Sequence, residues 1–369
     1  MPKTTETVLE IDLTALGKNY HYLKSRIKDT TKLLGVVKAF AYGSDAVIIA
    51  KELEALGVDY LAVAYVNEGV ILRDVGIKTP ILVLHPQPEN FETLIDRCLE
   101  PSLYNESVLK QFIKIASEKK QLNYPVHLKF NTGLNRLGFN ESEVDKIVSE
   151  LNATRNIKVT SLFSHLAASE DLKEKCFSES QISTFRNIAK NISSKLSYQP
   201  KLHMSNTSGI LNYPEAQFDM VRSGIGLYGF SNIPEEQKNF IPIATLKSVI
   251  SQIHTIKKGD SVGYNRAFKS KGTIVTATIP IGHADGISRA YGNGKGWVMV
   301  QGIKAPIIGN VCMDMMMVNI TGIVCKEGDE VIVFGGNNKA DLLAESIESI
   351  SYELLTAISQ RVKREVCRK

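Results

Sequence analysis

The chain has 369 residues, of which 43% are hydrophobic and 22% charged, and its formal net charge is +5. This length suggests about two domains, and the composition is that of a soluble globular enzyme. Lysines and arginines are spread along the whole chain, which argues against a nucleic-acid-binding protein, and no segment is long and apolar enough to cross a membrane. The only basic run, at residues 361–369, is expected to be the solvated end of a helix.

The cysteines and histidines indicate the cellular compartment of the protein and whether it binds a metal. The five cysteines are scattered without close pairs, which predicts reduced thiols in a cytoplasmic protein and no disulfide framework. Residues 1–10 contain neither an apolar signal core nor a cleavage-site pattern. The seven histidines lie far apart without metal-ligand spacing, so the sequence predicts no metal site.

From residue 8 to about residue 230, short apolar runs alternate with stretches of helical periodicity. After an extended segment at 8–13, the expected strands are 33–41, 60–66, 80–85, 98–104, 125–131, 160–165, 201–205 and 220–228. The expected helices are 46–56, 68–74, 91–97, 107–119, 143–151 and 179–195. This alternation predicts right-handed βαβ units, and about eight of them fit a closed (β/α)8 TIM-like barrel of ~250 residues. An open doubly wound sheet is disfavoured, because no GxGxxG turn follows the first strand.

The pattern changes at the polar stretch 231–236, which is expected to be a linker. The expected strands beyond it are 244–256, 273–281, 297–301, 311–320 and 330–334, with a last helical patch at 342–362. We therefore predict a barrel domain over residues 1–238 and a mostly-β C-terminal domain over residues 239–369. Whether the first ten or so residues pair with the C-terminal domain is left open.

Lys38 is the first candidate for chemistry. It follows the buried run 33–37, and the small residues Ala39, Ala41 and Gly43 leave room beside it. Lysines are rarely buried unless they are paired or used covalently. Lys38 is therefore either a strand-end lysine that reaches solvent or a Schiff-base lysine whose pKa is lowered by burial.

Further candidate residues lie at or near the ends of the expected strands, and in a barrel the carboxyl ends of the strands form one catalytic rim. They are Tyr42, Lys129, Arg136, His165, Ser205, Arg222, Gly224 and Ile225. Each has an alternative explanation. His165 is equally well a satisfied strand-end histidine, and Arg222 could pair with Asp219. In the C-terminal half, Tyr264 stands in a turn-rich segment, where a packed aromatic is the alternative to a catalytic tyrosine.

The segment Lys38–Gly43 resembles the pyridoxal-phosphate (PLP) attachment signature of the alanine racemases. Further matches follow in the same order through both halves of the chain, at 129–138, 165, 204–207, 222–229, 262–264, 284–286, 311–314 and 350–353. The family's fold is an N-terminal (β/α)8 barrel with a C-terminal β domain, in agreement with the pattern of elements.

The resemblance implies a homodimer that interconverts L- and D-alanine by a two-base mechanism. Lys38 would carry PLP and act on one face of the substrate, while Tyr264 of the partner subunit would act on the other, because racemisation removes a proton from one side and returns it on the other. The implied role is to supply D-alanine for peptidoglycan in the cytoplasm. Further PLP-binding residues would be Tyr42, His165, Ser205, Arg222, Gly224, Ile225 and Tyr352. The alanine carboxylate would meet Arg136 and Met313, and Lys129 matches a position that is carbamylated in some members.

The sequence departs from the family pattern at Phe40, Ser44-Asp45, Asn131 and His283, and these departures leave strictness for alanine over serine open. A broader serine/alanine racemase is therefore the nearest alternative. A PLP-homeostasis protein would lack residues 240–369. A fold-related decarboxylase of basic amino acids would place an acidic residue where this chain has Arg222.

Overall fold

The computed structural model describes residues 6–369, which form two compact units. The barrel unit consists of Gly17–Ala41 and Ala46–Phe240, and the β unit, among the described residues, of residues 6–16, Tyr42–Asp45 and Ile241–Lys369. The predicted fold class is confirmed: an eight-stranded parallel barrel is followed by a mostly-β domain. No helix in the described part of the chain is long and apolar enough to cross a membrane.

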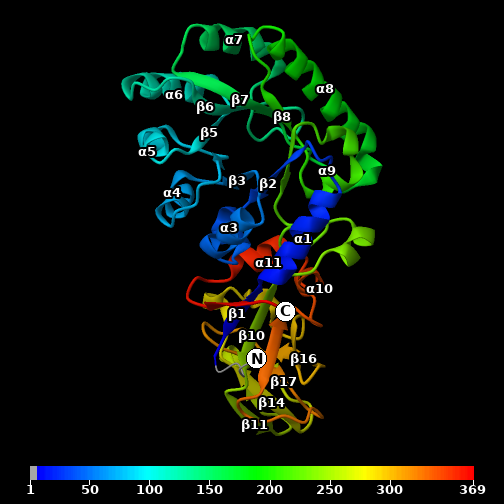
Figure 1. Cartoon of the computed structure of the whole chain (residues 1–369). Coiled ribbons are helices and arrows are strands. Elements are labelled where there is room, and N and C mark those ends of the chain that lie inside the picture. The colour runs from blue at the N-terminus through cyan, green and yellow to red at the C-terminus, as the bar shows by residue number, and fades with distance from the viewer. Residues whose placement is uncertain (1–5) are drawn as a thin grey trace. The chain divides into compact units, whose positions relative to one another are not determined.

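The barrel closes in the order β2-β3-β4-β5-β6-β7-β8-β9. Figure 1 shows the strands of this unit with the helices outside them. Its strands are β2 Lys32–Val36, β3 Tyr60–Val63, β4 Ile81–Val83, β5 Glu100–Leu103, β6 Tyr124–Lys129, β7 Ile157–Phe163, β8 Lys201–His203 and β9 Met220–Ser223. Each lies within or overlaps an apolar run of the sequence, because strands buried on both faces read as continuous hydrophobic segments. The carboxyl ends of these strands form the rim that carries the candidate site.

Helices surround this barrel, as the alternating pattern predicts. They are α3 Ala46–Ala55, α4 Val66–Asp74, α5 Phe91–Asp96, α6 Glu106–Glu118, α7 Val144–Asn152, α8 Lys175–Ser193 and α9 Thr207–Asn212. Helix α1, Leu13–Ser25, precedes the first barrel strand and was not expected from the sequence. Its apolar positions are interrupted by Gly17, Asn19 and two tyrosines, which are poor helix formers.

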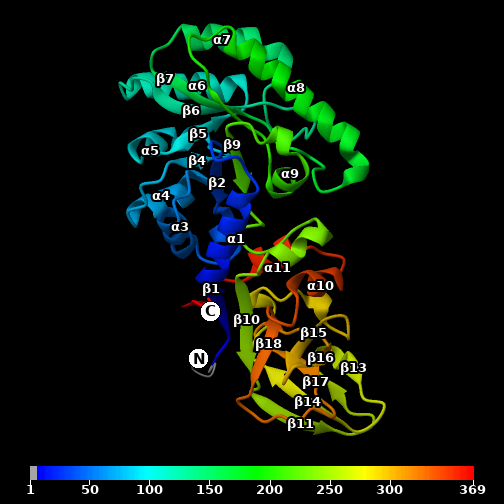
Figure 2. The ribbon, with the colours of Figure 1, turned by 45° about the vertical axis from the view of Figure 1, so that its right-hand side comes forward.

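The β unit is built on a nine-stranded sheet in the order β11-β14-β17-β16-β15-β18-β10-β1-β19 (Figure 2). Its strands are β1 Val8–Asp12, β10 Ala244–Val249, β11 Gln252–Ile256, β14 Ile274–Ile279, β15 Trp297–Val300, β16 Ile303–Ile308, β17 Met316–Asn319, β18 Glu330–Phe334 and β19 Lys363–Cys367. A separate hairpin, β12 Ser261–Val262 and β13 Phe268–Lys269, carries Tyr264 between its strands. Of the first ten residues, residues 1–5 lie outside the described part, and β1 pairs antiparallel with β10.

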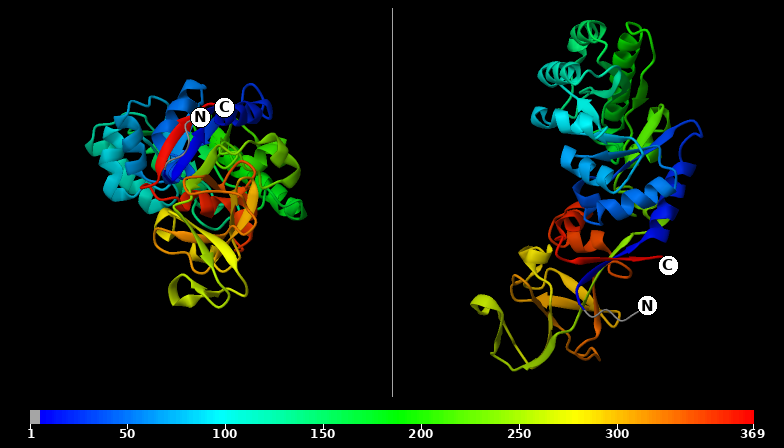
Figure 3. Two further views of the ribbon diagram at one scale, coloured as in Figure 1. Left: turned by 90° about the horizontal axis from the view of Figure 1, so that it is seen from below. Right: turned by 60° about the vertical axis from the view of Figure 1, so that its left-hand side comes forward.

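The end of the chain differs from the expectation. The patch 342–362 is not one helix, because α10 Ala340–Glu345 ends before Glu348, whose φ of 59° is left-handed, and α11 Ser351–Ala357 starts anew. The basic run at the C-terminus is not a helix end either. Most of it forms β19, which lies beside β1 in a parallel pair (Figure 3).

Candidate active site

The backbone changes hand directly after Lys38. Strand β2 ends at Val36, so the expected strand 33–41 is wrong beyond this point, and the next residues form the turn α2, Lys38–Tyr42. Its last four residues, Ala39 to Tyr42, have φ values between 52° and 54°. The left-handed conformation costs an L-residue roughly 1–2 kcal/mol. Backbone strain of this kind clusters at functional sites, which marks the surroundings of Lys38 for function.

Glu68 of α4 holds the first part of this turn. One carboxylate oxygen accepts the N–H of Ala39 at 2.7 Å, and the other accepts the N–H groups of Ala64 and Tyr65 at 2.7 and 3.1 Å. Sequence reasoning missed Glu68. Its only signal was a carboxylate in the first turn of a helix, which is a common capping position. The structure therefore adds Glu68 as the anchor of the lysine-bearing turn.

Four basic side chains of the barrel act on one another electrostatically, namely Lys38, Lys129, Arg136 and Arg222. Burial and the charge of Arg136 lower the pKa of Lys38, although Glu68 opposes this. Burial and the three other cations lower the pKa of Lys129 to about 8. Such a concentration of positive charge is suited to an anionic ligand, and it favours amines that can lose their proton near neutral pH.

Arg222 is buried in the barrel and surrounded by uncharged acceptors. Its Nη1 donates to His203 Nδ1 at 2.6 Å, and the distances from Nη2 are 2.7 Å to the Ser164 carbonyl, 3.0 Å to the Met204 carbonyl and 3.0 Å to His165 Nδ1. Burial lowers the pKa of Arg222 to about 9. Burial and the nearby cations also keep the pKa of His165 well below its usual range, so this ring is neutral.

The contacts of Asp219 and His165 bear on whether Arg222 pairs with Asp219 and whether His165 is only a satisfied strand-end histidine. Asp219 accepts the N–H of Leu202 at 2.8 Å, and no carboxylate forms an ion pair with Arg222 within residues 6–369. The alternative that Arg222 pairs with Asp219 is therefore wrong. His165 is only half-buried and accepts from Arg222, so it is linked to the cationic cluster.

The loop after β6 turns back onto the end of that strand and carries Arg136. Asn131 donates its N–H to the Phe139 carbonyl, and its side-chain oxygen accepts the N–H groups of Gly133 and Asn135 at 3.2 and 3.0 Å. These are acceptor contacts that an aspartate would also make, so the departure at Asn131 preserves the acceptor role. A Cβ at Gly138, where φ is +135°, would lie 2.5 Å from the Asn131 nitrogen.

The other predicted cofactor residues of the barrel lie in the loops after β8 and β9. Ser205 is buried, and its hydroxyl donates to the Ala216 carbonyl at 2.8 Å. Gly224 and Ile225 follow β9, and their carbonyls accept from the N–H groups of Leu227 and Tyr228. The backbone N–H groups of Gly224 and Ile225 have no acceptor within the described residues. Two successive free N–H groups can bind an anion.

The remaining predicted residues belong to the β unit. The rings of Tyr42 and Tyr352 lie 6.0 Å apart between centroids, and burial followed by the charge of Tyr352 raises the pKa of Tyr42. Tyr264 is 73% exposed and Met313 is 59% exposed. Asn310 connects their segments, because its side-chain amide donates to the Tyr264 carbonyl at 3.3 Å.

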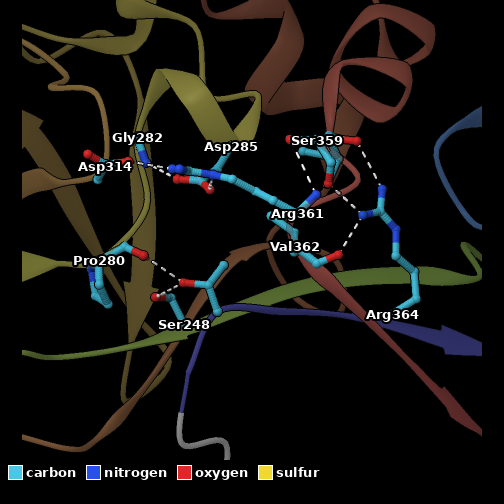
Figure 4. A network of polar contacts seen from close by, with 11 residues as sticks. Ser248, Pro280, Gly282, Asp285, Asp314, Ser359, Arg361, Val362 and Arg364 are labelled. Atoms are coloured by element: carbon cyan, nitrogen blue, oxygen red, sulfur yellow. Dashed lines mark hydrogen bonds and ion pairs between the residues drawn. The ribbon is translucent and has the colours of Figure 1, made fainter.

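An arginine that the sequence did not single out holds the Met313 segment. Arg361 donates to Asp285 at 2.7 Å and to Asp314 at 2.6 Å (Figure 4). The N–H of Ala284 also donates to the Met313 carbonyl at 3.0 Å. Two sequence motifs, at 284–286 and 311–314, are thus joined through one guanidinium. Its position near the C-terminus gave no local signal of this role.

Comparison with known families gives the decisive observation. The family model for the N-terminal domain of alanine racemase matches residues 11–232, and that for the C-terminal domain matches residues 243–366. The chain belongs to the alanine racemase family of enzymes. The resemblance inferred from the sequence motifs is thereby confirmed.

Curated alanine racemases match over nearly the whole chain. The enzyme of Thermodesulfovibrio yellowstonii is 34% identical over 365 residues, with 96% of each chain covered. That of Halothermothrix orenii is 35% identical over 370 residues, covering 98% of this chain and 97% of its own.

Solved alanine racemases share the fold. The structure from Clostridium difficile 630 has a TM-score of 0.93 at 32% identity, covering 99% of this chain and 97% of its own. The structure from Bartonella henselae, described with covalently bound pyridoxal phosphate, has a TM-score of 0.89 at 27% identity, covering 99% and 100%. The structure from Bacillus anthracis, with bound L-Ala-P, has a TM-score of 0.91 at 28% identity, covering 100% and 97%.

Proposed function

We propose that this protein is a PLP-dependent racemase that interconverts L- and D-alanine by a two-base mechanism, in a homodimer with shared sites. The observation that carries the proposal is the cationic cluster at the barrel rim, in which Lys38 directly precedes a strained turn and Arg222 meets only uncharged acceptors. The Bartonella henselae relative with covalently bound pyridoxal phosphate supports the same cofactor here.

The residues present fit PLP. Lys38 supplies an amine whose pKa is lowered, as a covalently attached lysine requires. Arg222 has a third nitrogen, Nε, without an acceptor within residues 6–369, so it retains a donor for the pyridine nitrogen. The free N–H groups of Gly224 and Ile225 suit the phosphate. Bound PLP would supply an electron sink for the substrate's Cα carbanion.

Ser205, Tyr42 and Tyr352 are proposed as further phosphate-binding residues, and His165 as a residue that supports Arg222. Ser205 would have to redirect its hydroxyl, which now donates to the Ala216 carbonyl. The neighbouring rings of Tyr42 and Tyr352 support a common role for their hydroxyls. Arg222, which is charged at neutral pH, disfavours a proton on the pyridine nitrogen, and this weakens the electron sink and limits side reactions of the carbanion.

Two bases divide the proton transfers. We assign the removal or return of the Cα proton on one face to Lys38 and on the other face to Tyr264 of the partner subunit. Tyr264 is 73% exposed in the described chain, which is compatible with action on a neighbouring copy. Because each base serves one face, either enantiomer can lose its proton to one base and receive it from the other.

Arg136 and the backbone at Met313 are proposed to bind the alanine carboxylate. The loop of Asn131 positions Arg136, and Arg361 fixes the Met313 segment. Lys129 is proposed to be carbamylated, because its pKa of about 8 leaves a reactive neutral amine and the surrounding cations would stabilise the negative carbamate. The L-Ala-P ligand of the Bacillus anthracis relative supports an alanine-sized substrate.

The proposed biological role is to supply D-alanine for peptidoglycan in the cytoplasm. The location is supported by the five free cysteines, all of them in the described part of the chain. The test of the proposed activity is chiral chromatography of purified protein with PLP and either L-alanine or L-serine. D-alanine formation supports the proposal, comparable D-serine formation identifies a broader racemase, and no racemisation of either substrate refutes it.

A further inference from the structure

A chain of buried polar side chains runs through the barrel away from Arg222. His203 Nε2 lies 2.8 Å from Ser161 Oγ, Ser161 Oγ lies 2.6 Å from His127 Nδ1, and His127 Nε2 lies 2.7 Å from a carboxylate oxygen of Glu100. Together with the bond from Arg222 Nη1 to His203, this makes four consecutive hydrogen bonds. The five residues come from the five successive strands β5 to β9, and Glu100 is the first residue of its strand.

The direction of every bond in this chain is determined by chemistry. An arginine can only donate, so His203 Nδ1 accepts. His203 is neutral, because burial and the charge of Arg222 keep its pKa well below the usual range, and its proton therefore lies on Nε2. Ser161 must then accept from His203 and donate its single proton to His127 Nδ1. His127 in turn donates from Nε2 to Glu100, since a carboxylate accepts.

Arg222 and Glu100 set the same direction from the two ends of the chain. A serine hydroxyl and a neutral imidazole can each donate or accept on either side, so Ser161, His127 and His203 alone would allow both directions. In the reversed direction His203 Nδ1 would carry a proton and face an N–H of Arg222. Two donors would then oppose each other inside a fully buried part of the barrel, where an unsatisfied polar group is costly.

We propose that Glu100, His127 and Ser161 are positioning residues of the racemase: through Ser161, which accepts the Nε2–H of His203, they hold the His203 ring in place and thereby the orientation of the Arg222 guanidinium. None of the three was singled out from the sequence, and Glu100 lies at the amino end of its strand, away from the catalytic rim. The inference rests on the proposed function for its effect on catalysis, whereas the hydrogen bonds of the two histidines are a property of the chain itself.

The test replaces Ser161 and measures the nitrogen NMR signals of the two histidines and the kcat of racemisation. In Ser161→Ala the link between the two histidines is removed. Nitrogen NMR of the full chain with labelled histidines, with and without PLP, should still show Nε2–H forms, which Arg222 and Glu100 maintain, but the signals of His203 Nε2 and His127 Nδ1 should shift because both nitrogens lose Ser161 as their partner. The signals are assigned from His127→Gln and His203→Gln. We expect kcat to fall about tenfold, the change that corresponds to one hydrogen bond of about 1.4 kcal/mol. KM for alanine should change less than twofold.

The chain offers a matched control in Ser102. It is equally buried, faces His127 in the strand register, and its hydroxyl has no hydrogen-bond partner within the described residues. Ser102→Ala should leave the nitrogen signals of both histidines and kcat unchanged, and Ser161→Thr, which retains a hydroxyl, should restore most of the activity. If the only effect were the loss of a buried oxygen atom, Ser161→Ala and Ser102→Ala would lower kcat equally.

Unchanged signals of His203 Nε2 and His127 Nδ1, with kcat equal to that of Ser102→Ala, would overturn the proposal. If Ser161→Ala does not fold, Glu100→Ala removes the terminal acceptor at a half-buried position, and the same two readouts decide. Absence of racemisation in the unaltered protein would refute the proposed function instead. The NMR result would still test the hydrogen-bond chain.

Discussion

Replacing Lys129 by methionine should stabilise the cofactor-free protein. Lys129 is only 7% exposed, and its pKa is lowered from 10.5 to about 8 by burial and by Arg136, Arg222 and Lys38. A lowering by about 2.5 pKa units, at 1.36 kcal/mol for each unit, amounts to about 3 kcal/mol. Lys129→Met removes the buried charge, so its free energy of unfolding at pH 7 should exceed that of the parent by up to about 3 kcal/mol.

The stability gain of Lys129→Met should depend on pH, because the pKa of Lys129 differs between the folded and the unfolded protein. Because the folded-state pKa lies below the unfolded one, the penalty of a charged Lys129 is fully present below pH 8 and disappears as the pH rises through 10.5. The advantage of the variant should therefore shrink over this range. If carbamylation occurs, added bicarbonate should stabilise the parent protein and leave Lys129→Met unaffected.

Urea unfolding in buffer freed of carbon dioxide measures these differences. Lys114→Met is the control, because Lys114 lies on α6 with 74% of its side chain exposed and should change stability by no more than about 0.5 kcal/mol. A loss of more than about 1 kcal/mol for Lys129→Met under these conditions would contradict the account, since it would mean that the charged amine is stabilised in the fold.

Three further predictions concern other parts of the protein. Tyr264→Phe should lower kcat in both directions by about 10² or more, with little change in thermal stability because the side chain is exposed, and a loss under tenfold by chiral chromatography would argue against its role as a base. Arg361→Gln should raise KM for alanine several-fold, since it loses its charged bonds to Asp285 and Asp314, whereas an unchanged KM would show that the Met313 segment needs no such support. Gly43→Ala should cost more than about 2 kcal/mol, because its φ is +81° and the new Cβ would lie 2.2 Å from the Leu355 carbonyl oxygen. Gly57→Ala has nearly the same φ but open space, and equal urea midpoints for the two variants would refute the contribution of the contact.

The barrel could be predicted because its signals are local. Each buried parallel strand reads as one apolar run, and each surrounding helix has its own periodicity. Lys38 was found for the same reason, as a lysine among small residues at the end of such a run. Strand β16 was missed because it contains Pro306, which usually excludes a residue from a sheet.

Features that depend on distant residues could not be predicted. Strand β19 pairs with β1 from the other end of the chain, and its sequence, in which three of five residues are charged, gives no sign of that partner. Glu68, Glu100 and His127 act through contacts with other strands and turns, so nothing in their immediate sequence indicates a role. The left-handed turn after Lys38 was equally hidden, because Ala39 and Phe40 have no preference for that conformation.

The most direct test of the account is to locate the cofactor on the chain. The protein is incubated with PLP, treated with borohydride to fix any Schiff base, digested and examined by mass spectrometry, and racemisation is measured in parallel. The account predicts one phosphopyridoxyl group, on Lys38, with neither the label nor D-alanine formation in Lys38→Ala. A label on a different lysine, or racemisation that persists in Lys38→Ala, would contradict it.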